Sequence, residues 1–347
     1  MHAIPGDQEV RVAPLMAIPQ LLAERGADPA ALLAEFDLPA DHFDHPENTL
    51  SAPVVGRLLG RCVEETGCVH FGLLVGERAS ASALGPVGFL MQSASDVGTA
   101  LRKLIAGFHT HDRAGTVVLR EEAGYATVTY TLLSHDVENA AQILDCAIAI
   151  AHNVLRSLCG RQWRPVEVRL AHRRPRDSAP FRKFFGVMPV FDAESSGLVF
   201  PSTWLAARTA GADAFLHAMM EKRVQELVAS SRVDLPDAVR RVIRRAVSIR
   251  ECTLQSVAKV LGTTGRTLNR RLQENGTTFR ELREEVRFDA ACQLIAQTGL
   301  TATEVADTLG YSDASAFSRA FERWSGMPPT RWRAAQARRR PRRRAVR

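Results

Sequence analysis

The last third of the chain repeats one pattern of apolar, small and glycine positions. The copies are Val257-Ala258 with Leu261-Gly262 and, forty-eight residues later, Val305-Ala306 with Leu309-Gly310. A helix-turn-helix needs such a pattern, because a small residue lets the second helix approach the first and a glycine can take the left-handed conformation that ends a helix. Each copy therefore predicts two short helices packed at a steep angle.

Apolar residues after each copy place the second helix of each pair. They lie four residues apart, which puts them on one helix face: Leu268 and Leu272 after the first copy, and Phe317 and Phe321 after the second. Thr301 and Glu304 have the spacing of a capping box, and Ser312 is expected to be the N-cap of the helix that carries Phe317. The two copies thus predict two complete helix-turn-helix motifs.

A single long helix is predicted between the two motifs, from Thr278 to Gln297. Its apolar residues keep helical spacing: Phe279, Leu282, Val286, Ala290, Leu294 and Ile295. About nineteen residues at about 1.5 Å each give a rod of roughly 28 Å, close to the pitch of about 34 Å of one DNA turn. Such a rod would hold two second helices in successive major grooves.

The pattern before residue 230 mixes helical and alternating stretches. Helices are expected over 13–25, after Pro29, after Pro53, over 97–108, from about 137 to 158 and over 212–229, with a glycine-rich passage at 72–88. The runs 116–120 and 126–132 alternate around a short turn and predict an antiparallel hairpin, and 166–170 and 197–200 are further strands. The predicted fold is an α+β domain, followed by an all-α domain with two helix-turn-helix motifs joined by a long helix.

Charge separates the same two regions. Residues 234–347 hold 23 Lys and Arg against 12 Asp and Glu, a net of +11, whereas residues 1–233 hold 22 against 26, a net of −4. A basic C-terminal region predicts that this part alone binds a polyanion. The expected organisation is an N-terminal domain over 1–229, a polar linker over 230–236, a DNA-binding domain over 237–335 and an Arg-rich, disordered tail over 336–347.

Other chemistry finds little support in the sequence. The six cysteines form no zinc-binding spacing, and the chain has no G-x-S-x-G, P-loop or H-E-x-x-H motif. His109, His111 and Asp112 are a possible metal group, but two histidines do not complete a zinc shell. We expect no metal, no cofactor and no enzyme activity. The absence of a signal peptide and of a continuous apolar span predicts a cytoplasmic protein with free thiols and no membrane partner.

The C-terminal pattern resembles a known family. Residues 254–276, 279–296 and 302–333 are similar to the DNA-binding domain of AraC-type transcription regulators. Residues 71–76, 85–88 and 184–200 resemble the effector-binding and dimerisation domain of one AraC subfamily, which usually has Asn where this chain has Ser196. The resemblance implies a homodimeric activator that binds double-stranded promoter DNA, a small-molecule effector of unknown identity, and RNA polymerase.

The second helix of each motif supplies the candidate DNA-reading residues. Because this helix enters the major groove, its outward residues face the bases: Arg266, Asn269 and Arg270 in the first copy, and Ser315 and Arg319 in the second. Arg pairs with guanine and Asn with adenine, so the first copy is expected to supply most of the base reading. Candidate backbone contacts are Thr264, Thr267, Arg271, Ser312, Ser318 and Arg323.

The effector residues cannot be assigned from the pattern. Six residues would line a pocket or simply fill the core: Phe71, Phe89, Met91, Phe108, Tyr130 and Trp163. Two alternatives to an effector-controlled regulator stay open. One is a constitutive DNA-binding regulator whose N-terminal domain only dimerises, which a solid core would favour. The other is an enzyme domain attached to a DNA-targeting domain, which a nucleophile beside a base in a pocket would favour.

Overall fold

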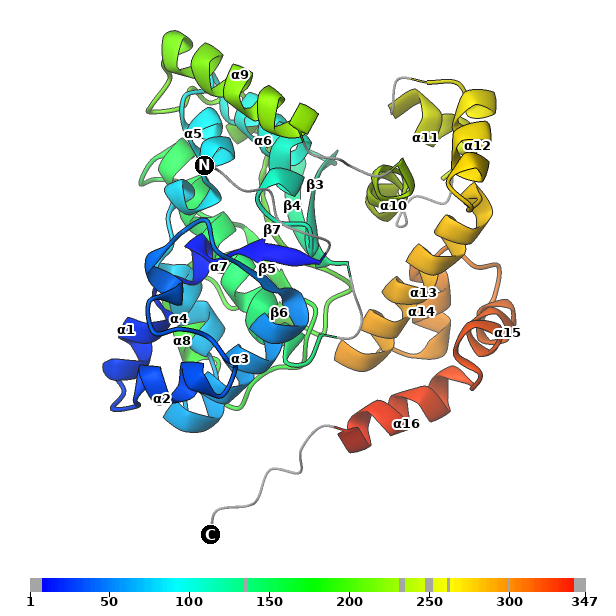
Figure 1. Ribbon diagram of the computed structural model, residues 1–347, viewed down its shortest axis with the longest axis horizontal. Helices are drawn as coiled ribbons and strands as arrows, with labels where there is room; N and C mark the ends of the chain where they lie inside the picture. The colour runs from blue at the N-terminus through cyan, green and yellow to red at the C-terminus, as the bar shows by residue number, and fades with distance from the viewer. Residues whose placement is uncertain are drawn as a thin grey trace. The chain divides into compact units, whose positions relative to one another are not determined.

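The computed structural model describes residues 8–133, 137–230, 235–246, 252–260, 263–298 and 300–339. The chain divides into two compact units, Met1–Arg232 and Val233–Arg347. The first is a mixed α/β unit and, in the part that the structure describes, the second is built of helices (Figure 1). This confirms the predicted fold class.

A five-stranded sheet forms the centre of the N-terminal unit. Its order is β3-β4-β7-β5-β6, and its strands are β3 (Gly115–Glu122), β4 (Tyr125–Leu132), β7 (Ser196–Pro201), β5 (Glu167–Leu170) and β6 (Val190–Phe191). The β3–β4 hairpin is antiparallel, with Val118 opposite Thr129. The hairpin and the two later strands are confirmed. The two-residue strand β6, parallel to β5, is too short to leave a periodic signal.

Helix α7 (Ala140–Cys159) packs against β4 and β7, and also against α3 (Ala52–Thr66) and α4 (Phe71–Arg78). The approach of α4 to α7 is close enough that a Cβ built on Gly72 would lie 2.0 Å from the carbonyl oxygen of Gln142. The glycine-rich passage at 72–88, to which the pattern assigned no helix, thus forms α4 and, after a short 3-10 turn, α5 (Pro86–Gln92). Gly72, Gly76 and Gly88 allow close packing, whereas Gly85 takes a φ of 63° in the turn before α5.

The polar residues that interrupt α7 join it to its neighbours. The Gln142 side chain accepts a hydrogen bond from the Gly72 amide at 2.7 Å and donates to the Val69 carbonyl at 2.9 Å. The Asn153 side chain donates to carbonyls at the end of α4, including that of Gly76 at 3.1 Å. No helix among the described residues is long and apolar enough to cross a membrane.

The predicted helix over 13–25 is divided. The structure has a 3-10 turn, η1 (Ala13–Leu15), followed by α1 (Ile18–Ala23). Pro19 explains the break, because proline has no amide hydrogen to donate and is tolerated in the first turn of a helix but not in its interior. The remaining elements of this unit surround the sheet and α7: β1 (Glu9–Arg11), α2 (Pro29–Ala34), η2 (His42–Asp44), β2 (Thr49–Ser51), η3 (Ala81–Leu84), α6 (Val97–Gly107), η4 (Phe108–Thr110), α8 (Ala179–Phe185), η5 (Ser202–Ala206) and α9 (Ala214–Ser230).

The C-terminal unit contains two separate hydrophobic cores that share one helix. Its helices are α10 (Leu235–Ala246), α11 (Leu254–Val260), α12 (Gly265–Glu274), α13 (Phe279–Gln297), α14 (Ala302–Thr308), α15 (Ala314–Ser325) and α16 (Pro329–Arg339). Phe279, Leu282 and Val286 of α13 belong to the core around α11 and α12. Cys292 and Ile295, further along α13, belong to the core around α14 and α15. The continuous central helix is confirmed.

Local signals set the helix ends in this unit. Both α13 and α14 begin with a capping box, Thr278 with Glu281 and Thr301 with Glu304. Gly310 takes a left-handed φ of 74° after α14, as the repeat predicts. Leu261-Gly262 of the first copy lies outside the described residues. Helix α16 continues to Arg339, so the first four residues of the expected tail are helical, and 340–347 lie outside the described residues.

Two arginines of α10 form ion pairs with carboxylates. Arg240 pairs with Asp237 at 2.7 Å and with Glu285 of α13 at 2.9 Å, and Arg244 pairs with Asp289 of α13 at 3.0 Å. The carboxylates lie about one helix turn apart on α13, matching the spacing on α10. These two arginines therefore hold α10 against α13.

Candidate DNA interface and effector pocket

Helix α12 is positioned by its buried side. Leu268 and Leu272 are fully buried in the first core of the C-terminal unit. Residues three or four apart share one face of a helix, and the face away from Leu268 and Leu272 carries the exposed Arg266 and Arg270 and the half-buried Asn269. The three predicted base-facing residues of the first motif thus share the accessible side of one helix.

Two threonines cap the N-terminal end of α12. The Thr264 side chain accepts a hydrogen bond from the Thr267 amide at 3.3 Å, which makes Thr264 the N-cap. The two hydroxyls also lie 3.0 Å apart. Both threonines, predicted to contact the DNA backbone, therefore lie at the N-terminal end of the helix, where the amide dipoles favour an anion such as phosphate.

The ion pair that Arg270 forms within α12 is weak. Arg270 forms an ion pair with Glu274 at 3.6 Å, and the two side chains are 70% and 61% exposed. Exposed pairs of this kind contribute at most about 1 kcal/mol. Arg270 can therefore exchange this partner for a base or phosphate at small cost, and the neighbouring Arg271 is exposed as well.

Helix α15 presents a second, less basic face. Phe317 and Phe321 are fully buried, whereas Ser315 and Arg319 are exposed. The hydroxyl of Ser318 donates to the Ala314 carbonyl of its own helix at 2.8 Å, so this side chain is half-buried and occupied. Two of the predicted base-facing positions thus share the exposed side of α15, and Ser318 is less available than expected.

The N-cap of α15 is Asp313 and not Ser312. The Asp313 carboxylate accepts from the Ala316 amide at 2.7 Å, and Ser312 donates to that carboxylate at 3.0 Å. The backbone hydrogen bond from Ala316 lowers the pKa of Asp313. Both residue types are good caps, and a carboxylate gains more from the helix dipole.

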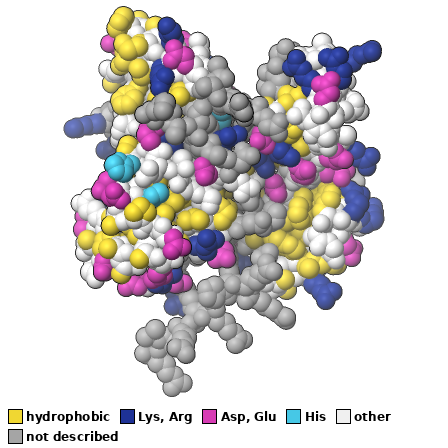
Figure 2. Space-filling view, in the orientation of Figure 1, with side chains coloured by type: hydrophobic (Ala, Val, Ile, Leu, Met, Phe, Trp, Pro, Cys, Tyr) yellow, Lys and Arg dark blue, Asp and Glu magenta, His cyan; other side chains and the backbone are white. Residues whose placement is uncertain are grey.

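Basic side chains gather near these helices. Figure 2 shows Lys and Arg side chains over α12 and α15, which Figure 1 labels at the right of the view. Arg323 extends over the ring of Trp324 at 5.9 Å and lies 3.6 Å from Glu284 of α13. This exposed arginine, a predicted backbone contact, is held near the surface of α15 by weak interactions.

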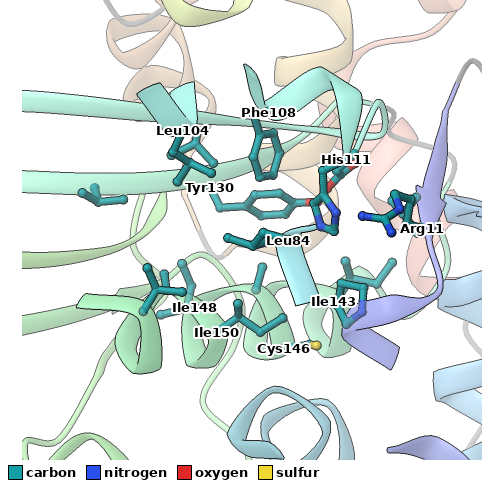
Figure 3. Close-up of a pocket in the computed structure, with 18 of the residues that line it drawn as sticks. Arg11, Leu84, Leu104, Phe108, His111, Tyr130, Ile143, Cys146, Ile148 and Ile150 are labelled. Atoms are coloured by element: carbon teal, nitrogen blue, oxygen red, sulfur yellow. The ribbon is translucent and has the colours of Figure 1, made fainter. Parts of the chain in front are cut away.

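A mostly apolar cavity of about 110 Å³ lies inside the N-terminal unit. Its walls come from α7, the β3–β4 hairpin, α6 and the segment 10–15, and include Leu84, Leu104, Phe108, Ile143, Ile148 and Ile150 (Figure 3). Four polar residues lie on its lining at one end: Arg11, His111, Asp112 and Tyr130. The unit therefore does not have a solid core.

The short strand β1 holds Arg11 in this wall. β1 pairs with β2, with Arg11 opposite Thr49, and the Arg11 amide donates to the His111 carbonyl at 3.3 Å. The Arg11 side chain is 2% exposed and contacts the Glu47 carboxylate through Nη2. Its Nε and Nη1 have no hydrogen-bond partner among the residues that the structure describes.

Asp112 is fixed by three donors. The Tyr130 hydroxyl donates to Oδ2 at 2.9 Å, and the amides of Ala114 and Gly115 donate to Oδ1 at 2.7 and 2.9 Å. Burial raises the pKa of Asp112 to about 6, against the lowering effect of these hydrogen bonds. The carboxylate thus orients Tyr130 and closes the loop before β3, which is a structural role for one member of the possible metal group His109, His111 and Asp112.

The candidate pocket residues from the sequence divide into two sets. Phe108 and Tyr130 line the cavity. Phe71, Met91 and Trp163 are buried outside its lining, and Phe89 is 44% exposed. Arg11 was missed. Its one sequence signal is a charged residue inside the otherwise apolar run Val10 to Ala13.

A second buried polar pair lies away from the cavity lining. His172 Nε2 is 2.8 Å from Asp145 Oδ1, and its Nδ1 is 3.0 Å from the Arg173 carbonyl oxygen. Because both neighbours are acceptors, they favour the doubly protonated form of the ring. Burial lowers the pKa of His172, but the charge and hydrogen bond of Asp145 outweigh it, and the pKa is raised overall.

The free energy of unfolding is therefore expected to depend on pH through His172. A raised pKa in the folded state contributes stability that is complete below the unfolded value of about 6.5 and is lost as pH rises through the folded value. Urea unfolding between pH 6 and pH 9 should show this loss. The double variant Asp145→Asn/His172→Gln should lack it, while His45→Gln at an exposed histidine should keep it. Parallel pH profiles for all three proteins would contradict the assignment.

The fold and these two sites define a transcription regulator with a DNA-binding helix-turn-helix region. Residues 26–209 match the family model described as the arabinose-binding domain of AraC transcription regulator, N-terminal, and residues 257–335 match a helix-turn-helix domain. The chain belongs to the AraC family of transcription regulators.

Known relatives are similar along nearly the whole chain. The HTH-type transcriptional regulator VirS of Mycobacterium tuberculosis is 27% identical over 328 residues, which cover 94% of this chain and 96% of VirS. The ornithine utilization regulator of Pseudomonas aeruginosa is 28% identical over 331 residues, with the same coverage. The crystal structure of the transcriptional regulator CdpR from Pseudomonas aeruginosa is 25% identical, covers 96% of this chain and 99% of its own, and has a TM-score of 0.48.

Proposed function

We propose that this protein is a cytoplasmic, sequence-specific transcription activator that a small molecule controls by binding in its N-terminal unit. The observation that carries the proposal is the pairing of two separately cored helix-turn-helix motifs on one central helix with a mostly apolar cavity in the other unit. Activation, not repression, is the sign that family membership favours.

For DNA reading, we propose that α12 and α15 enter successive major grooves. Arg266, Asn269 and Arg270 would contact base edges from α12, and Ser315 and Arg319 from α15. The nineteen residues of α13 span roughly 28 Å, near the length of one DNA turn. Backbone contacts would come from Thr264, Thr267, Arg271, Ser312, Ser318 and Arg323 around the two helix starts and edges.

Effector control is supported by the cavity, which a domain that only dimerises does not need. A catalytic use of the cavity finds less support. Cys146, its one thiol among the described lining, has a pKa that burial raises to about 12, so it stays neutral and poorly nucleophilic. The Asp112 carboxylate is occupied by three donors. An effector that binds one arrangement of the two units better would shift which promoter half-sites the protein reaches.

A homodimer and a contact with RNA polymerase complete the proposal. Helix α9 carries exposed apolar side chains, with Phe215 77% and Met219 48% exposed. Exposed apolar residues on one helix are typical of a protein interface. We therefore propose that the dimer contact uses this helix and that the DNA-bound activator also contacts RNA polymerase.

Single substitutions in α12 should change base preference. Arg266→Ala or Arg270→Ala is expected to cost about 1–3 kcal/mol of specific binding and to relax one position of the recognised sequence. The control is Arg331→Ala, at an exposed arginine of α16, which should leave the recognised sequence unchanged. Selection from a random DNA library measures both, and an unchanged preference in the α12 variants would refute their base-reading role.

The test of the overall function is selection of genomic fragments by the purified protein, followed by transcription of the gene beside the bound site. A defined site with two half-sites, and transcription that rises with an effector, are expected. Broad binding that salt removes, with no shared sequence, would overturn the proposal.

A further inference from the structure

The guanidinium of Arg11 is the one described cation on the cavity lining. It is 2% exposed, and its Nε and Nη1 have no partner within the described part of the chain. Buried nitrogens of this kind almost always have an acceptor, because leaving them without one costs the hydrogen bonds that water would give. In Figure 3 the side chain reaches from β1 towards His111 and the polar end of the cavity.

The shape and polarity of the cavity limit what reaches Arg11. A volume of about 110 Å³ is somewhat below that of an engineered apolar cavity of about 150 Å³ that holds benzene. Leu104, Ile148 and Ile150 contribute apolar wall opposite and beside the polar end. A body of about one aromatic ring, or a short aliphatic chain, fits such a space, whereas a sugar would bring hydroxyls that these walls leave unpaired.

We propose that the effector is a small monocarboxylic acid with an apolar body, whose carboxylate accepts hydrogen bonds from Arg11 while its body fills the cavity. This inference deepens the proposed function and rests on it, because it names the chemical class of the controlling molecule.

The charges around Arg11 favour an anion over a neutral or cationic ligand. Burial lowers the pKa of Arg11 and the paired Glu47 raises it, with a net lowering, so a further acceptor on Nε and Nη1 would stabilise the charged guanidinium. Asp112 does not supply that acceptor, because its carboxylate is engaged by Tyr130 and two backbone amides. A carboxylate suits a buried guanidinium better than a neutral carbonyl, since hydrogen bonds between charged groups are the stronger ones.

The experiment measures binding to the full-length protein by titration calorimetry. The ligands are benzoate, phenylacetate, hexanoate and octanoate, each compared with its amide. At least one acid is expected to bind one-to-one, with its amide at least about tenfold weaker. Absence of binding by all four acids at millimolar concentration, or equal binding by an acid and its amide, would overturn the inference.

Two variants locate the site. Ala151→Leu fills the cavity and leaves Arg11 and Glu47 in place, so it should abolish acid binding while DNA binding persists. Arg11→Met/Glu47→Met removes both charges together, which avoids a lone buried charge, and should bind acid and amide alike. Wild-type affinity for the acid in either variant would place the ligand elsewhere.

Failure of this inference can be told apart from failure of the proposed function. A defined DNA site whose transcription responds to a molecule without a carboxylate would leave the regulator standing and remove the acid. Acid binding at Arg11 by a protein that selects no DNA sequence would keep the ligand class and remove the regulator.

Discussion

Phe317→Ala is expected to unfold the second helix-turn-helix while the first stays folded. Phe317 is fully buried, with its ring 5.5 Å from that of Tyr311 and 5.8 Å from that of Phe321. Removing a buried phenylalanine costs about 3–5 kcal/mol, a large part of what a small core provides. Because Leu268 and Leu272 belong to a different core, the loss should stay local.

Hydrogen exchange resolved by helix is the measurement. Amides of α14 and α15 should lose protection in Phe317→Ala, and those of α12 should keep it. Val166→Ala, at a valine that is 55% exposed, is the control and should change protection little in the C-terminal unit. Equal loss in α12 and α15 would show that the two motifs unfold as one, against the separation of their cores.

Gly72→Ala is expected to destabilise the N-terminal unit by about 3 kcal/mol, at the upper end of overpacking effects. The added Cβ would lie 2.0 Å from the Gln142 carbonyl oxygen and within 3 Å of two more backbone atoms of Gln142. Backbone cannot turn aside as a side chain does, so α4 has to move away from α7. That movement also strains the hydrogen bond from the Gly72 amide to Gln142.

Thermal and urea unfolding of the N-terminal unit test this prediction. The matched control is Gly265→Ala, where the nearest atom to the new Cβ is 3.7 Å away, which is ordinary contact. That helical position should be unchanged or slightly more stable, since alanine favours a helix over glycine. If both variants unfold alike, the close approach of α4 and α7 is not what makes Gly72 necessary.

What the sequence predicted well depends on neighbours within a few residues. Both helix-turn-helix motifs, the central helix α13 and the capping box at Thr301 follow from helical period and local hydrogen bonds. The error at Ser312 has the same origin, because Ser312 and Asp313 are adjacent and both are good caps.

What the sequence did not predict depends on partners far along the chain. Arg11 contacts Glu47 and lies beside His111, separations that no local period encodes. Helix α4 was missed because glycines at positions 72 and 76 lower helix propensity, and only packing against α7 explains them. The pairing of Arg244 with Asp289, forty-five residues away, is likewise a contact between helices that no local pattern encodes.

Strand β1 lies outside residues 26–209, the part that matches the shared N-terminal family model. Chains of this family can therefore keep the whole matched region and still differ at the position of Arg11. Under the proposed role of Arg11, a change in the segment around β1 would alter which ligand such a regulator binds, while its promoter stays the same. Control by a new signal would then need a substitution in this short strand and none in the DNA-reading helices.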